Sequence, residues 1–338
     1  MTTLKDVARA AGVSAQTVSN VVNNRAVVRR ETRQRVLEAL DRLDYRPNLA
    51  ARGLRRRQSR ALAFLVVDPS PRYLADPFHG SVLTGLAEVA RERGYGLVIQ
   101  GLPPDGKGGG RLSDVYRHAQ IDGAVVTLGG TAVERRRHLG DLRRGGGPFV
   151  LLEQSVGAGD DAAGVRGRNR SGAAAVTRHL LAAGHRHLGL VIPDLAWPAV
   201  EERVRGFRGA VESQRARTTA RVVRCGPETP DAARDATEGL LAAHPKMTAV
   251  LGANDLLAVG ILDALRRRGL RCPEDVAVAG FDDFDLARWI RPPLTTVRLP
   301  GDEMGRRAAE LLIARLENGR FSTRRLEVAT ELIVRESA

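Results

Sequence analysis

The sequence lacks a long apolar run, and this absence argues against a membrane-spanning helix. None of its 338 residues belongs to a stretch approaching the roughly 20 apolar positions that a helix needs to cross a bilayer. The N-terminus also lacks the apolar segment of a secretory signal. A hydrophobic content of 43% nevertheless suffices for buried cores. We expect a globular, cytoplasmic protein, and the length predicts two or three domains.

Cysteine is scarce as well. Only Cys225 and Cys272 occur, and neither has a metal-ligand partner at short spacing. The sequence therefore predicts neither a disulfide framework nor a zinc site, and we expect no metal and no cofactor.

Catalytic motifs are missing, although one segment imitates a phosphate-binding loop. GLPPDGKG at 101–108 has the P-loop spacing and follows a predicted strand. Gly108, however, stands where a hydroxyl should bind magnesium, and Pro103 and Pro104 remove two backbone donors from the cradle. DPSPRYLADP at 68–77 is not a dinucleotide-binding glycine motif. We therefore expect no enzyme. The alternative is a P-loop-like or other nucleotide- or sugar-processing enzyme with a basic N-terminal module.

The N-terminal segment carries the signature of two short helices joined by a tight turn. Thr3 followed by Asp6 is a helix start, Gly12 is a helix stop, and Ser14 caps a second helix over 15–22. A third helix over 31–44 is needed to complete a core. Its predicted inward side chains are Val36, Leu37, Leu40 and Leu43.

The second helix has a polar face that suits a DNA groove. With Val18 and Val21 turned inward, Ala15, Gln16, Ser19 and Asn20 point outward. Gln and Asn side chains bind adenine through two hydrogen bonds when a helix enters the major groove. The alternative is a small helical bundle with a solvated polar face.

Positive charge is concentrated in the same region. Residues 1–60 hold 14 Lys and Arg against 5 Asp and Glu, which is nine of the net +14. Such a patch is typical of a phosphate-binding module and predicts salt-dependent binding, although a solvated surface or a membrane-surface patch has the same composition.

Residues 46–60 contain six arginines and no acid. A helix over 49–54 is too short to be stable alone, and Gly53 weakens it further. Leu54 is an apolar side chain of the kind that wedges between base steps. The alternative is a flexible basic linker.

From residue 60 onward, strands and helices alternate in two successive series. Apolar strands are predicted at 61–67, 97–99, 124–128 and 149–152, and a second series runs from a helix at 170–183 to a strand at 276–280. This alternation is typical of α/β folds with parallel sheets. Two series imply two lobes, with a ligand between them at the carboxyl ends of the strands.

The whole chain resembles the LacI-type bacterial transcription regulators. The resemblance rests on LKDVARAAGVSAQTVSNVVNN at 4–24, GHRHLGLV at 184–191, RVRGFRGAV at 203–211, AND at 253–255, GLRCPEDVAVAGFDD at 269–283 and RPPLTTVRLP at 291–300. It implies a helix-turn-helix headpiece at 1–46, a hinge segment at 47–59 and a periplasmic-binding-protein-like effector and dimerisation domain at 60–338.

The resemblance also implies how the two lobes are built. The chain would cross between them near 160, 290 and 320. The first lobe would then hold about 60–160 and 290–320, including a helix at 301–318. The second would hold about 161–289 and 321–338, including a strand at 326–334.

The DNA-binding residues implied by the resemblance lie in the headpiece and the hinge. The hinge helix of such regulators folds on operator DNA and inserts a leucine, which Leu54 matches. Two positions differ from the family pattern. Arg29 stands where such headpieces often have a capping Ser, and Asn20 occupies a position that varies within the family and bears on which operator is read. The implied DNA-contacting set is Thr3, Ser14, Ala15, Gln16, Thr17, Ser19, Asn20, Asn23, Arg52, Leu54 and Arg55.

The effector-binding residues implied by the resemblance follow predicted strand ends. Three of these residues also have a purely structural interpretation. Arg203 could pair with a carboxylate, Asn254 could cap a helix, and Asp282 could cap a turn. Alternatively, one of Phe78 and His79 belongs to the hydrophobic core instead of the ligand site. The implied set is Phe78, His79, Glu153, Arg168, Trp197, Arg203, Asn254 and Asp282.

Two departures from the family pattern bear on the ligand. Arg168-Asn169 stands where Asp-Asn is usual, which predicts either an anionic effector such as a sugar phosphate or an Arg168 turned to solvent. CGPE at 225–228 lacks the aromatic residue that some members stack on a ligand, although Trp197 offers another wall.

The resulting prediction is a nucleoid-associated, homodimeric transcriptional regulator, most simply a repressor. It binds a near-palindromic operator and responds to a sugar, a sugar phosphate or a nucleobase. No heptad tail follows the last predicted strand, which favours a dimer over a tetramer.

Overall fold

The computed structural model describes residues 3–22, 28–45, 59–68, 75–102, 111–157, 160–214 and 218–338. The chain divides into two compact units, Met1–Ser59 and Arg60–Ala338, and each has a hydrophobic core of its own. Asn23, Arg52, Leu54, Arg55, the hinge segment up to 58 and the loop at 103–108 lie outside the described residues.

The first unit, here called the headpiece, contains α1 (Leu4–Ala11), α2 (Ala15–Val22) and α3 (Arg30–Arg42). The predicted helix start is confirmed, because Thr3 Oγ1 accepts from the Asp6 N–H at 3.3 Å and Asp6 Oδ2 accepts from the Thr3 N–H at 2.9 Å. Gly12 ends α1 at φ 64°, where glycine is favoured. Ser14 Oγ accepts from the Thr17 N–H at 3.1 Å and so caps α2.

Valine and alanine side chains from all three helices fill the headpiece core. Val18 and Val21 are buried as predicted, and Val36 and Ala39 meet them from α3. The prediction for Leu37 is wrong, since this side chain is 47% exposed. Ala39, three residues after Val36, stays on the inward stripe of α3, whereas Leu37 lies about 100° around the helix. Arg29 makes no side-chain cap, in line with its departure from Ser.

A six-stranded parallel sheet forms the base of the first lobe. Its strand order is β11-β5-β4-β3-β1-β2. The strands in chain order are β1 (Ala61–Val67), β2 (Gly96–Leu102), β3 (Gly123–Leu128), β4 (Phe149–Leu152), β5 (Ala162–Gly167) and β11 (Arg325–Val328). Along β1, Leu62, Phe64 and Val66 face one core while Ala63, Leu65 and Val67 face another. A strand buried on both faces reads as a continuous apolar run, as in the sequence.

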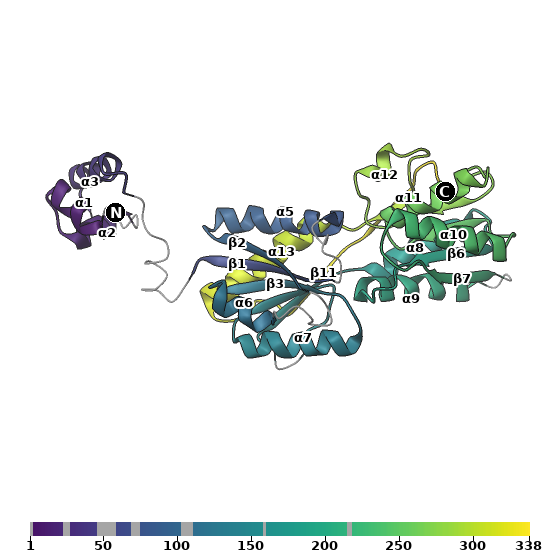
Figure 1. Cartoon of the computed structure of the whole chain (residues 1–338), viewed down its shortest axis with the longest axis horizontal. Helices are drawn as coiled ribbons and strands as arrows, with labels where there is room; N and C mark the ends of the chain where they lie inside the picture. The colour runs from purple at the N-terminus through teal and green to yellow at the C-terminus, as the bar shows by residue number, and fades with distance from the viewer. Residues whose placement is uncertain are drawn as a thin grey trace. The chain divides into compact units, whose positions relative to one another are not determined.

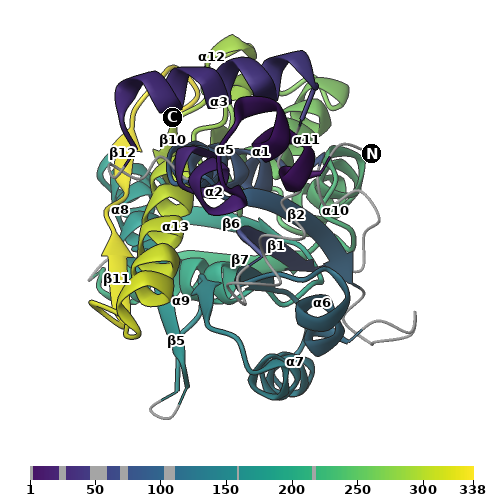
Figure 2. The ribbon, with the colours of Figure 1, turned by 90° about the vertical axis from the view of Figure 1, so that its left-hand side faces the viewer.

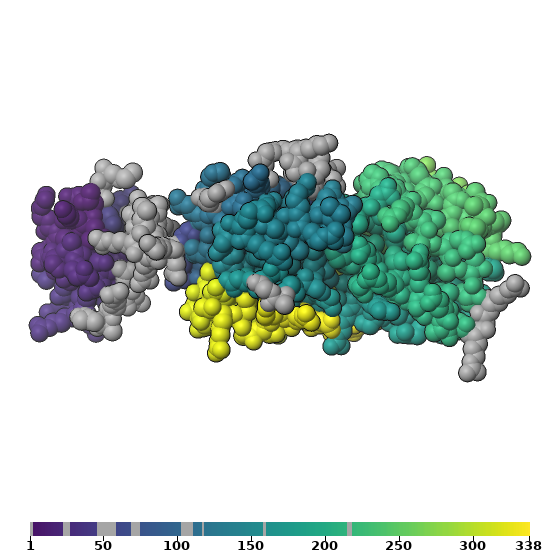
Figure 3. All heavy atoms as spheres, turned by 90° about the horizontal axis from the view of Figure 1, so that it is seen from below, coloured from purple at the N-terminus to yellow at the C-terminus, as the bar shows by residue number. Residues whose placement is uncertain are grey.

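Helices cover both faces of this sheet (Figure 1). One face carries α5 (Pro77–Glu92) and α13 (Gly301–Asn318), and the other carries α6 (Leu112–His118) and α7 (Ala132–Gly145). α5 and α13 touch through Gly85 and Gly305, where a Cβ on either would overlap the backbone of the other helix. Figure 3 shows the yellow C-terminal segment against the first lobe despite its distance along the chain.

The second lobe repeats the pattern with a four-stranded parallel sheet in the order β7-β6-β8-β9. The pair α8–α9 packs on one face and the pair α10–α11 on the other (Figure 1). The elements are α8 (Asn169–Ala182), β6 (His187–Ile192), α9 (Pro198–Glu212), β7 (Thr219–Arg224), α10 (Pro230–Ala243), β8 (Ala249–Gly252), α11 (Asp255–Arg267), β9 (Ala277–Ala279) and α12 (Leu286–Trp289). The predicted fold class, α/β with two parallel sheets behind a helical headpiece, is confirmed.

The chain crosses between the lobes later than predicted. β5 and β11 pair side by side in the first sheet, so the crossings follow Gly167 and Val328 instead of falling near 160 and 320. A third crossing follows β10 (Thr296–Arg298), which pairs antiparallel with β12 (Glu331–Ile333). The single predicted strand at 326–334 is thus two strands in different sheets, since each half finds a different partner. Figure 2 shows β5, β11 and β12 along one edge.

The helices among the described residues include none with the length and apolar character required to span a bilayer.

Candidate functional site

The outward face of α2 is the first candidate site. Gln16 is exposed, and its Nε2 donates to Asn20 Oδ1 at 3.2 Å, so the two amides lie side by side one turn apart. Ser19 is half-buried beside them. Ala15 differs from the prediction, because it lies at the first turn of α2 and packs partly against the headpiece core. The outward face is therefore formed by amide and hydroxyl groups suited to base edges.

Three further predicted DNA-contacting residues hold the helix starts in place. Thr3 Oγ1 donates to Asp6 Oδ2 at 2.6 Å, and the hydroxyls of Ser14 and Thr17 share a hydrogen bond of 2.9 Å. The hydrogen bond to Thr3 holds the pKa of the Asp6 carboxyl below its usual range. Thr3 and Ser14 are also exposed, so a phosphate can reach the same helix starts.

The second candidate site is a small cavity between the lobes, with a volume of about 50 Å³. Its lining comes from the N-terminus of α5, the ends of β3 and β4, the start of α9 and the loops after β7, β8 and β9. Seven of the eight predicted effector-binding residues line it, and Arg168 does not. The lining is Asp76, Phe78, His79, Thr127, Leu128, Leu152, Glu153, Trp197, Pro198, Ala199, Val200, Arg203, Glu228, Asn254 and Asp282.

Arg203 is the buried centre of the cavity wall. Its Nη2 donates to Asp282 Oδ1 at 2.7 Å, its Nη1 to the Ala253 carbonyl at 2.6 Å, and its Nε to Asn169 Oδ1 at 2.8 Å. Nη1 also reaches Asp282 Oδ2 at 3.3 Å, and the guanidinium lies 3.8 Å from the centre of the Phe281 ring. Of the alternatives for Arg203, the carboxylate pairing is thus present. Burial raises the pKa of Asp282, and Arg203 opposes that rise.

Glu153 extends this network from the first lobe. It directly follows β4 at a φ of 59° and accepts from the Gly167 N–H at 3.1 Å and from Asn169 Nδ2 at 2.8 Å. Because Asn169 also accepts from Arg203, it links the two lobes. Burial raises the pKa of Glu153 to about 7. Asn169 was not among the predicted site residues, although the Arg168-Asn169 dipeptide was noted as a departure from Asp-Asn.

Glu228 is a second buried carboxyl of the cavity, and sequence reasoning missed it. Its Oε2 accepts from Trp197 Nε1 at 3.2 Å, and its Oε1 accepts from Asn254 Nδ2. Asn254 Oδ1 accepts from the Leu257 N–H at 3.0 Å, so Asn254 caps α11 while it faces the cavity. Burial, with repulsion from Asp76 and Asp282, raises the pKa of Glu228 to about 8. The available signal was the CGPE segment at 225–228, which was noted for lacking an aromatic residue while its carboxyl was passed over.

Aromatic rings form the apolar wall of the cavity. His79 lies with its ring centre 6.0 Å from those of Phe64, Phe78 and Trp197. It is buried, and its Nδ1 is 3.6 Å from Asp76 Oδ2. Asp76 also caps α5 by accepting from the Phe78 N–H at 2.8 Å. Phe78 and His79 therefore both line the cavity and also pack against neighbouring rings.

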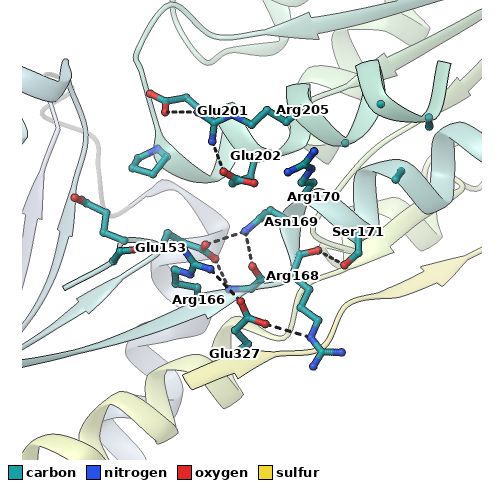
Figure 4. A pocket seen from close by; sticks show the side chains of 18 of the residues that line it. Glu153, Arg166, Arg168, Asn169, Arg170, Ser171, Glu201, Glu202, Arg205 and Glu327 are labelled. Carbon is teal, nitrogen blue, oxygen red and sulfur yellow. Dashed lines mark hydrogen bonds and ion pairs between the residues drawn. The ribbon is translucent and has the colours of Figure 1, made fainter. Parts of the chain in front are cut away.

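Arg168 lies in an open hollow between the lobes that shares Glu153 and Pro198 with the cavity (Figure 4). Its side chain is 57% exposed, and its Nε is 3.6 Å from Glu327 Oε2. The backbone N–H of Arg168 donates to the Val328 carbonyl at 3.0 Å, at the point where the chain crosses between lobes. The Arg168 side chain is thus turned to solvent outside the cavity, and the effect of Arg168 on which effector binds stays a prediction.

The cavity combines fixed hydrogen-bonding groups with a flat apolar wall. This combination suits a small polar molecule with ring or hydroxyl groups. Cys225 and Cys272 are free thiols away from it, and the described part of the chain holds no cluster of three metal-ligand side chains.

Comparison with known proteins matches both units of the chain. The description "Bacterial regulatory proteins, lacI family" fits residues 3–48, and "Periplasmic binding protein-like domain" fits residues 177–338. The regulator CelR of Thermobifida fusca is 33% identical over 340 residues, covering 99% of this chain and 98% of the relative. The ribose operon repressor of Halalkalibacterium halodurans is 29% identical over 337 residues, covering 100% and 97%.

A solved structure extends the likeness to three dimensions. The complex of the transcriptional regulator CelR with cellobiose superposes with a TM-score of 0.73 at 30% identity, and the match covers 100% of both chains.

Proposed function

The chain belongs to the lacI family of bacterial regulatory proteins, and we propose that it is a sequence-specific DNA-binding regulator controlled by a small-molecule effector. The observation that carries this proposal is the polar, outward face of α2 on a capped helix-turn-helix. The relatives that match over nearly their full length are named as transcriptional regulators or repressors. Repression is the mode we assign.

The proposed active form is a homodimer on a near-palindromic operator. Each headpiece reads one half-site, so the twofold axis of the protein matches that of the DNA. The segment 47–59 acts as a hinge that orders on the operator, and Leu54 wedges into its centre. The protein works in the cytoplasm, in association with the nucleoid, and it is not an enzyme.

The effector is proposed to bind in the cavity between the lobes and to favour one closure state. Arg203, Asn169 and Glu153 form a hydrogen-bonded path from the second lobe to the first, so a ligand that alters this path alters lobe closure. Closure changes the spacing of the hinges and hence operator affinity. Because coupling is reciprocal, operator DNA changes effector affinity by the same factor.

Among the effector classes considered, sugars have the best support. The cavity offers carboxyls, an amide and a Trp197 wall, and a related regulator was solved with cellobiose. A nucleobase also suits the aromatic wall. The cavity lining does not include Arg168, the cation on which the sugar-phosphate hypothesis rests, and that hypothesis stays untested.

Selection of binding sites from a pool of random duplexes tests the DNA-reading role. The wild-type protein should recover duplexes that share a near-palindrome. Gln16→Ala should lose about 10- to 100-fold in affinity for that sequence, because a good bidentate base contact contributes about 1–3 kcal/mol. Recovery of duplexes without a common motif would reject the proposal.

Leu54→Ala is the matched test of the hinge. It should weaken operator binding while leaving affinity for a cavity ligand intact. An equal loss of affinity on random DNA would instead favour a basic linker over a wedge.

A further inference from the structure

The carboxyl groups of the cavity outnumber its cations. Asp76, Glu153, Glu228 and Asp282 all line it, whereas Arg203 is the single guanidinium in that lining. Asp282 pairs with Arg203 and Asp76 lies beside His79, whereas no ion pair among the described residues reaches Glu153 or Glu228. Burying a charge without a partner is costly, so this surplus has to be neutralised by protons or by a bound cation.

Arg203 cannot serve all four carboxyl groups. Its Nε and Nη1 donate to Asn169, Ala253 and Asp282, and Nη2 donates to Asp282. Both oxygens of Glu228 are held by the neutral donors Trp197 and Asn254. Both oxygens of Glu153 are held by the neutral donors Gly167 and Asn169. The hydrogen bonds are thus satisfied while the charges are not.

Asp76 and Glu228 lie close enough for the charge of Asp76 to raise the pKa of Glu228. Both carboxyl groups line the same cavity, so the surplus of negative groups coincides with the ligand space.

We propose that the effector of this regulator is a small organic cation, a hydroxylated amine such as an amino sugar, whose ammonium group binds beside Glu228 and Asp76. This inference rests on the proposed function of the cavity and narrows its ligand class. The hydroxyl groups of such a ligand meet Asn254 and Glu153, and its ring lies on Trp197. A metal ion is a poorer occupant, because no three ligating side chains gather among the described residues.

Matched pairs of ligands provide the first test. The melting midpoint of the full-length protein is measured with glucose, glucosamine, gluconate and glucose 6-phosphate, and with cellobiose and its diamino counterpart. The amine of each pair should bind at least tenfold more tightly than the neutral sugar, and Glu228→Gln should remove that preference. Glu212→Gln, an exposed glutamate on the same helix as Arg203, is the control. Tighter binding of a neutral or anionic member would overturn the proposal.

If no member of the panel binds, the pH dependence of stability without ligand tests whether the charge of Glu228 is uncompensated. The charged groups facing Glu228 are Asp76 from α5, Asp68 from the end of β1, Asp282 after β9 and Arg203 from α9. The pKa of Glu228 is about 8 in the folded protein, against an ordinary value of 4.5. Between pH 4.5 and pH 8, the folded protein therefore keeps a proton on Glu228 that the unfolded chain has released. The contribution of Glu228 to stability therefore falls as the pH rises from about 5 to about 8.

Glu228→Gln should consequently melt above the wild type at pH 8 and close to it at pH 5.5, while Glu212→Gln should track the wild type at both. A Glu228→Gln protein that melts below the wild type at pH 8 would show that the carboxylate is already compensated, and the proposal would fail. Site selection on DNA is independent of both tests, so operator binding without an amine preference would reject this inference alone.

Discussion

The headpiece and the interlobe cavity handle charge in opposite ways. Residues 1–60 hold nine of the net +14 charges of the chain, and the headpiece keeps its polar side chains at the surface, over a core of small apolar residues. The cavity is lined by four carboxyl groups around one guanidinium. A surface charge in water costs little and acts on a distant polyanion, whereas a buried charge must be matched by its immediate neighbours. The two sites therefore suit a large anion and a small, closely fitted ligand.

Salt should separate the two sites most sharply. Operator binding should weaken by about 1,000-fold or more between 50 and 200 mM salt, because each neutralised phosphate releases counterions. Binding of a ligand in the cavity should change only severalfold, since buried interactions are screened much less. Fluorescence anisotropy with a labelled operator and calorimetry with a cavity ligand measure the two slopes. Equal slopes would erase the distinction between the sites.

Arg203→Ala should have the largest effect on stability. The substitution leaves Asp282 buried without its partner and removes the donors to Asn169 and Ala253, which should cost about 3–5 kcal/mol of unfolding free energy in the Arg60–Ala338 unit. Arg205→Ala, on the same helix and 56% exposed, should stay within about 0.5 kcal/mol. Urea unfolding of both variants measures the difference. If Arg203→Ala lowered the unfolding free energy by less than about 1 kcal/mol, Asp282 would be neutral and the ion pair would not hold the cavity wall together.

Arg168→Ala should have the smallest effect. Its side chain lies in the open hollow with Glu327 and outside the cavity, so affinity for a cavity ligand should remain within about twofold of the wild type. Calorimetry with the same ligand measures it. A large loss of affinity would return Arg168 to the binding site and revive the anionic effector.

The parts of both sites that could be predicted depend on neighbours in sequence. Thr3 and Asp6 are three residues apart, so their reciprocal cap follows from local rules, and the polar face of α2 follows from its helical period. The cavity residues were predictable to the extent that they follow strand ends, which a parallel sheet gathers at one edge.

The remainder depends on contacts between residues far apart in the chain. The direction of Arg168 is decided by Glu327, which lies more than 150 positions later, and the crossing points are decided by β11 pairing with β5. Glu228 was missed because its burial arises from Trp197 and Asn254, which come from two other loops. Leu37 was misplaced because the exact stripe of α3 depends on how Ala39 meets α1 and α2.

Coupling between the two sites is the central claim, and one titration tests it most directly. The ligand that most raises the melting midpoint is titrated into the full-length protein with and without a duplex from the site selection, and the duplex is titrated with and without the ligand. Ligand-controlled regulation predicts that the ligand and the duplex each change the affinity of the other by the same factor, and that this factor differs from one. A factor of one in both directions would mean that the headpiece and the cavity work independently, which would contradict ligand-controlled regulation.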